Sequence, residues 1–193
     1  YADRLHQEAH EPRLLLRACQ LLAEKEKWPE VASRIPFLEH VGTAETLRLA
    51  AGAAWNTHDP GLCLRVVERS HAAFPGGQLP ADLRGIRVEC LTRLGRISEA
   101  AEEATAVARS ENSTASIEHL VRVLLQKLDT RGAVVEARRL VDRPDLRAES
   151  ALNIASLLHA GDRGLGKALW RHAVGSGIKD VAVPMALQVG FAL

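Results

Sequence analysis

Aromatic residues are scarce in this chain, because Phe, Trp and Tyr together make up only 4% of its 193 residues. The strands of a β-sandwich favour aromatic and β-branched side chains, so this composition argues against that architecture. Alanine and leucine are abundant instead, and such side chains suit close packing between helices. Hydrophobic residues at 47% and charged residues at 25% are ordinary values for a folded globular protein.

Cysteine is equally sparse, with Cys19, Cys63 and Cys90 as the only examples. Their number is odd and no two of them form a CxxC pair, which excludes a disulfide framework and the usual zinc-binding spacing. Each lies in an apolar helical stretch, where a free thiol behaves as a small hydrophobic side chain. We therefore expect buried thiols in a reducing compartment and no cofactor.

Long apolar runs and an excess of one charge are also missing. No stretch approaches the ~18 consecutive apolar residues that a membrane-spanning helix needs, and no basic-then-apolar signal segment opens the chain. The formal net charge is +1, so no strong field attracts the chain to nucleic acid or to an anionic membrane. These absences predict a cytoplasmic protein with no membrane contact.

A regular spacing of small residues is the most informative feature that is present. The steps between these residues are 31, 37, 37 and 31, and a period of roughly 20 to 50 residues is typical of stacked structural repeats. Each small residue lies a few positions into the second helix of a predicted helix–turn–helix unit. The five residues are Ala32, Cys63, Ala100, Ala137 and Ala168.

Helical periodicity runs through the whole chain, and we see no convincing strand. Apolar side chains recur at i, i+3, i+4 and i+7, which predicts buried stripes that include Leu14, Leu21, Val135 and Leu157. Pro36 is expected to bend or interrupt its helix, because proline lacks the backbone N–H. The pattern therefore predicts an all-α fold, an α-solenoid of about five stacked helix–turn–helix hairpins followed by a terminal helix.

The segment Gly95–Ala100, which reads Gly-Arg-Ile-Ser-Glu-Ala, resembles the hairpin turn of the tetratricopeptide repeat. Gly132 followed by Glu136 and Ala137 has the same offset, and Pro75 lies where that family places its terminal proline. The small residue lets the two helices of a hairpin pack closely, and the glycine permits a tight turn. The resemblance spans nearly the whole chain, although most of the family's aromatic positions are aliphatic here.

The resemblance implies that the first helix of each hairpin lines a concave groove that binds a partner. An extended peptide could lie there, with its carboxylates held by planar guanidinium groups. The set of inward-facing residues is polar, with one aromatic side chain. Its members are expected to be Arg17, Arg48, Trp55, Asn56, Arg93, His119, Arg122 and Asn153.

Two short motifs suggest chemistry that their surroundings do not support. Residues 161–168 read Gly-Asp-Arg-Gly-Leu-Gly-Lys-Ala, close to a phosphate-binding P-loop, but a helix precedes them and Ala168 cannot bind Mg²⁺. His6 and His10 lie one helical turn apart, yet no third metal ligand accompanies them. We interpret the first as an interhelical turn and the second as a solvated helix face.

The predicted function is therefore that of a protein-interaction scaffold, not an enzyme, because no nucleophile–base pair or paired carboxylates stand out. Arginine outnumbers lysine 20 to 5, which we attribute to a GC-rich bacterial genome. The same arginines keep an alternative open, an RNA- or DNA-binding helical array that accompanies a catalytic domain elsewhere in the full-length protein.

Residues 1–193 are expected to form a single helical-repeat domain within a longer protein. The chain begins at Tyr1 and ends on the apolar run Val189–Leu193. Each solenoid repeat buries its apolar face against the next, so an uncovered terminal helix predicts self-association. The partner is expected to be a protein or a peptide.

Overall fold

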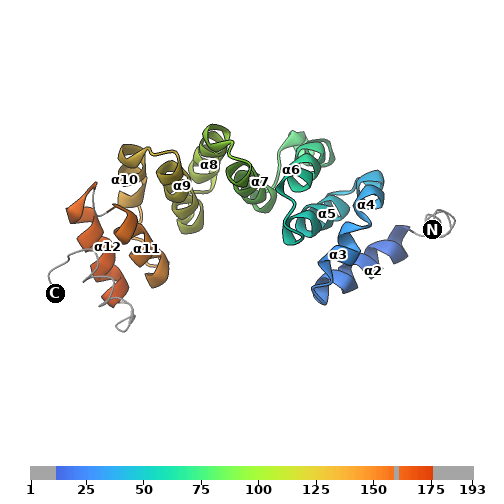
Figure 1. The fold of residues 1–193 in the computed structure, drawn as a ribbon, viewed down its shortest axis with the longest axis horizontal. Coiled ribbons are helices and arrows are strands. Elements are labelled where there is room, and N and C mark those ends of the chain that lie inside the picture. Colours follow the sequence, from blue (N-terminus) through green and yellow to red (C-terminus); the bar gives the residue numbers. More distant parts are fainter. Residues whose placement is uncertain (1–11, 159–160, 176–193) are drawn as a thin grey trace. The chain divides into compact units, whose positions relative to one another are not determined.

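The computed structural model describes residues 12–158 and 161–175, and every regular element in those ranges is helical. The chain divides between Arg96 and Ile97 into two compact units (Figure 1). The first unit contains α2 (Pro12–Glu24), α3 (Trp28–Ala32), α4 (Ile35–Val41), α5 (Ala44–Asn56), α6 (Pro60–Arg69), the 3₁₀ turns η1 (Ser70–Ala73) and η2 (Pro75–Gly77), and α7 (Ala81–Arg93). The second contains α8 (Ile97–Glu111), α9 (Thr114–Gln126), α10 (Thr130–Arg138), α11 (Ala148–Leu158) and α12 (Arg163–Gly175). The all-α prediction is confirmed.

Within each unit, helices that follow one another in the chain pack against one another. In the first unit α5 contacts α2, α3, α4, α6 and α7, and in the second α9 contacts α8, α10 and α11 while α12 packs on α11. The predicted helix around Pro36 is interrupted, as expected: α3 ends at Ala32, and Pro36 lies in the first turn of α4, where its missing N–H costs nothing.

The same turn conformation recurs where a first helix gives way to a second. Glu26, His58, Gly95 and Leu128 all have φ between 55° and 74°. In each case the next residue donates its N–H to the carbonyl five residues back, from Lys27 to Leu22, Asp59 to Ala54, Arg96 to Leu91 and Asp129 to Leu124. This hydrogen bond closes the end of the first helix. The tight turn is therefore maintained at four places, although only Gly95 is a glycine.

The register of the small residues differs from the prediction in three of the five repeats and agrees with it at Cys63 and Ala100. The fourth residue of each second helix is buried, namely Val31, Cys63, Ala100, Ala133 and Gly166. The steps between these positions are 32, 37, 33 and 33, which is more even than the predicted spacing. Ala137 is a buried residue one helical turn later, whereas Ala32 and Ala168 are only half-buried. Alanine occurs so often in these helices that the sequence alone does not distinguish the buried position from a nearby alanine.

The one long step of 37 residues has a local cause. After α6 the chain forms η1 and η2 before α7 begins at Ala81. Phe74 and Leu79, within and after these turns, are buried, so the extra residues belong to the core of the first unit. The loop predicted at 75–80 is confirmed, and it accounts for the irregular spacing.

Short polar side chains start several helices by accepting a hydrogen bond from a backbone N–H of the first turn. Thr43 accepts from Thr46 N at 3.3 Å, Asp59 from Leu62 N at 2.8 Å and Asp129 from Gly132 N at 2.9 Å. Asp162 caps α12 in the same way, accepting from Leu165 N at 3.0 Å. These caps satisfy N–H groups that have no partner within the helix.

The core consists largely of small and aliphatic side chains. Ala50, Ala51, Ala53 and Ala54 of α5 are all fully buried, which lets neighbouring helices approach closely. The three cysteines are buried free thiols, as predicted. The hydrogen bond between the Cys63 and Cys90 thiols raises the pKa of Cys63, together with burial, and lowers the pKa of Cys90.

Three leucines and a valine predicted to be buried are exposed instead. Leu14 is 64% exposed, Val135 57%, Leu157 55% and Leu21 41%. Helical periodicity shows that these residues share a face of their helix, but their burial depends on which neighbouring helices cover that face. The predicted terminal helix from Asp180 to Leu193, and with it the predicted self-association, lies outside the described residues, as does the His6–His10 pair.

Candidate functional site

A pocket opens between α9 and α11, two of the helices predicted to carry the binding surface. Glu118 and Arg122 of α9 line one side of it. They are four residues apart, which places them on the same face of the helix. Arg147, just before α11, and Glu149 in its first turn lie at the pocket as well. We call this hollow the α9–α11 pocket; its volume is about 210 Å³.

The rest of the α9–α11 pocket comes from one face of α11. Ser150, Asn153, Ile154 and Leu157 line it, and their i, i+3, i+4 and i+7 spacing makes them neighbours on a helix. Ile154 is anchored in the core with 3% exposure, whereas more than half of Leu157 meets solvent. The pocket therefore combines an exposed aliphatic wall with amide and hydroxyl groups that can bond a peptide backbone.

The charges around the α9–α11 pocket balance. Glu118 and Glu149 contribute two carboxylates, and Arg122 and Arg147 contribute two guanidinium groups. Their formal charges sum to zero, so the pocket does not present a surface of one sign. An anionic ligand would meet attraction and repulsion together.

A second part of the predicted surface lies along α5 and α7 in the first unit. The Arg93 guanidinium lies over the Trp55 ring, 4.0 Å from its centroid, close enough for a cation–π interaction. Arg48 donates from Nε to Asp82 Oδ2 at 3.1 Å, and its guanidinium also lies over the Phe74 ring at 5.4 Å. These contacts tie α5 to α7 and to the loop before it.

The remaining predicted residues make local contacts. Arg17 donates to Gln20 Oε1 at 3.3 Å and forms an ion pair with Glu24 at 3.7 Å, all on α2. The Asn56 amide donates to the Gly52 carbonyl of its own helix at 2.8 Å. His119 lies on α9 and is half-buried.

Of the eight predicted residues, the structure brings Arg122 and Asn153 together in one pocket and Trp55 and Arg93 in one contact. The sequence reasoning missed Glu118, Arg147, Glu149 and Ser150. It also assigned Leu157 to the core. Arg147 and Glu149 flank the start of α11. Glu149 lies four residues before Asn153 on the same helix, and this spacing is the sequence signal that marks the two as neighbours.

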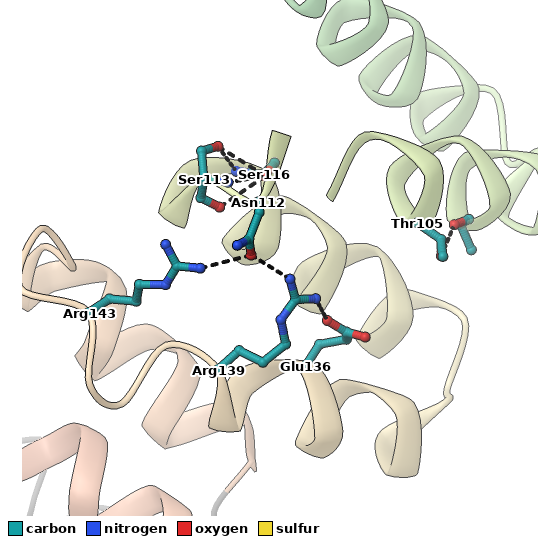
Figure 2. A network of polar contacts seen from close by, with 8 residues as sticks. Thr105, Asn112, Ser113, Ser116, Glu136, Arg139 and Arg143 are labelled. Carbon is teal, nitrogen blue, oxygen red and sulfur yellow. Dashed lines mark hydrogen bonds and ion pairs between the residues drawn. The ribbon is translucent and has the colours of Figure 1, made fainter. Parts of the chain in front are cut away.

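A polar cluster lies at the turn between α8 and α9 (Figure 2). Asn112, which has a positive φ of 47°, accepts hydrogen bonds on Oδ1 from Arg139 at 2.7 Å and Arg143 at 2.8 Å. Arg139 also pairs with Glu136. The cluster clamps the turn onto the end of α10, so we interpret it as structural.

Motifs that might indicate chemistry have structural roles in the described part of the chain. Residues 161–168 form the turn into α12, after helix α11, with Asp162 as the helix cap. In residues 12–158 and 161–175 no group of three or more His, Cys, Asp or Glu side chains could hold a metal ion. Among the same residues, no helix combines the length and apolar character needed to cross a membrane.

Comparison with known proteins identifies the fold. No protein-family model matches the sequence, and no curated protein sequence matches it either. Among solved structures, the chain is similar to that of YrrB, a TPR protein with an unusual peptide-binding site, with a TM-score of 0.71 over 97% of each chain. The two sequences are 12% identical, so the likeness establishes a tetratricopeptide-like helical-repeat fold and nothing more specific.

Proposed function

We propose that this chain is a protein-interaction scaffold that binds a peptide or partner segment on the exposed faces of the first helices of its repeats. The observation that carries the proposal is the α9–α11 pocket, where Arg122 and Asn153 lie beside a largely exposed leucine. Concave sites that combine an apolar wall with a few polar groups are typical of ligand recognition. YrrB, which has a similar fold, is described as having a peptide-binding site.

A scaffold role also fits what the fold lacks as a catalyst in its described part. The three cysteine thiols are buried, and the His, Cys, Asp and Glu side chains of residues 12–158 and 161–175 do not converge on a metal site. We therefore propose a binding role without catalysis. We also propose that residues 1–193 form one repeat domain and act in the cytoplasm.

The arginines of the described residues favour a protein partner over nucleic acid. Arg48 pairs with Asp82, Arg69 with Glu39 and Arg138 with Asp162. Guanidinium groups engaged by carboxylates are less available to phosphates, and the α9–α11 pocket carries no net charge. Nucleic-acid binding depends on neutralising several phosphates at once.

Site-specific photo-crosslinking tests this proposal. A benzophenone amino acid replaces Glu149, an exposed residue at the α9–α11 pocket, in one variant, and in the other it replaces Arg171, an exposed residue of α12. After irradiation in cells, the Glu149 variant is expected to yield a discrete adduct that a protease removes and a nuclease does not. Equal labelling at both positions, or an adduct destroyed by nuclease, would contradict the proposal.

A further inference from the structure

We propose that the α9–α11 pocket is a specificity pocket for one uncharged apolar side chain of a bound peptide, and not a clamp for a carboxylate. This inference rests on the proposed function and names the chemistry that its site selects. It differs from the expectation that arginines such as Arg48 and Arg122 bind acidic groups. Arg48 is bonded to Asp82 in the first unit, and Arg122 shares its pocket with two glutamates.

The size of the pocket fits one side chain. Its volume of about 210 Å³ exceeds the roughly 150 Å³ of an engineered cavity that holds benzene. A leucine, methionine or phenylalanine side chain therefore fits, but a folded domain does not. Because the pocket is open to solvent on one side, the peptide backbone would remain at its mouth.

The apolar wall supplies the attraction. Leu157 is 55% exposed and stands beside Ile154, which is fixed in the core. An aliphatic or aromatic side chain placed against Leu157 would remove apolar surface of both partners from water. The Asn153 amide and the Ser150 hydroxyl at the same wall can then bond the polar backbone of the peptide.

The charge balance supplies the selectivity. A carboxylate that approached Arg122 or Arg147 would also approach Glu118 or Glu149. A cationic side chain that approached the glutamates would be repelled by the arginines. A charged group of either sign would also lose part of its hydration in the pocket. An uncharged side chain meets neither penalty, so binding is expected to depend little on ionic strength.

The test begins with a random-peptide library displayed on phage and selected on the immobilised full chain. Enriched peptides are expected to share an aliphatic or aromatic residue at one fixed position and to have no invariant acidic residue. An enriched peptide is then labelled with a fluorophore, and its affinity is measured by anisotropy at about 50 mM and about 300 mM salt. The affinity is expected to change less than about twofold between these concentrations.

Two exposed apolar residues of the second unit provide a matched pair of variants. Leu157→Gln should weaken peptide binding about tenfold or more, as removal of a central contact does. Val135→Gln, at a residue of α10 with similar exposure of 57%, should change the affinity less than about twofold. Asn153→Phe, also at an exposed position, should fill the pocket and weaken binding as well, which keeps the test decisive if Leu157→Gln fails to fold.

The outcomes separate the two proposals. An invariant acidic residue with steeply salt-dependent affinity would overturn the apolar pocket, and so would peptides that bind Leu157→Gln and Asn153→Phe as tightly as the wild type. Both results would leave the scaffold function standing. A selection that enriches no peptide would count against the scaffold function itself.

Discussion

Three side chains other than glycine occupy left-handed conformations at the ends of first helices. Glu26, His58 and Leu128 take the place that Gly95 holds in the third turn. A Cβ atom makes this conformation less favourable by roughly 1–2 kcal/mol. The backbone is therefore strained at these residues, and the hydrogen bonds of the turn keep it in this conformation. Leu128 gains little in return, because 88% of its surface faces solvent.

Leu128→Gly is therefore expected to stabilise the chain. Relief of the left-handed strain outweighs the greater freedom of glycine in the unfolded state, with a net gain of up to about 1 kcal/mol. Urea denaturation followed by circular dichroism measures the change. Gly95→Ala is the matched control and should destabilise the chain by about the same amount; a Leu128→Gly variant less stable than the wild type would show that the turn is not strained.

At the scale of helices, two glycines lie inside first helices of the first unit without an evident packing reason. Gly52 lies within α5 and Gly85 within α7, and a Cβ added at either would meet no atom within 4 Å. Glycine in a helix costs about 1 kcal/mol relative to alanine. The fold alone does not explain why they are there.

Gly52→Ala and Gly85→Ala should each stabilise the first unit by up to about 1 kcal/mol. Thermal unfolding of the single variants measures this gain. Gly132→Ala offers the contrast, because its Cβ would lie 2.6 Å from the Asp129 carboxylate that caps α10, so that variant should lose stability. A loss of stability in Gly52→Ala would reveal a contact that the open space does not suggest.

The start of α12 makes a pH-dependent contribution to the stability of the fold. Asp162 caps the helix and pairs with Arg138 at 2.8 Å, and the hydrogen bond from Arg138 is the main cause that lowers the pKa of its carboxyl. Because the pKa is lower in the folded state, the stabilisation is present above the unfolded value of about 3.9 and is lost as pH falls through the folded pKa.

Asp162→Asn should accordingly be less stable than the wild type at neutral pH, and the difference should shrink as the pH falls below about 4 and vanish once the carboxyl is protonated in the folded state too. The amide oxygen can still cap α12, so the loss isolates the charge. Denaturation curves across this pH range measure it, with Asp142→Asn, at an exposed position outside any helix, as the control. A stability difference that persists unchanged in acid would mean that the carboxylate charge is not responsible.

Helix boundaries were more predictable than the faces of the helices. Pro36, Asp59 and the glycine-rich turns mark starts and stops because their backbone chemistry acts locally. The register of the small residues was wrong in three repeats; in the fourth repeat, Ala137 and Ala133 differ only in which neighbour they meet. For the same reason Leu157 could not be recognised as a pocket wall: its exposure depends on how α9 and α11 pack, and sequence periodicity does not contain that information.

At the scale of the whole molecule, the balance of charges bears on the two functions that the sequence left open. The net charge is +1, and arginines in both units pair with carboxylates of the same unit. A protein that binds nucleic acid through its backbone needs a surplus of unpaired cations on one face. The charge pattern therefore favours a peptide or protein partner.

The chain is expected to show no saturable binding to a generic single-stranded oligonucleotide at about 150 mM salt. Fluorescence anisotropy with labelled RNA and DNA checks this, and a repeat at low salt separates weak electrostatic attraction from a genuine site. Tight binding that falls steeply with salt, as counterion release requires, would support the nucleic-acid alternative.

Amide hydrogen exchange with and without a library-selected peptide tests the central claim most directly, because it locates binding without assuming the site. The account predicts that the peptide slows exchange in α9 and in the segment from Arg147 to Leu157. Exchange in α10 and α12 should stay unchanged. Protection confined to α10 and α12, with α9 and α11 unaffected, would contradict the claim that this chain binds its partner in the α9–α11 pocket.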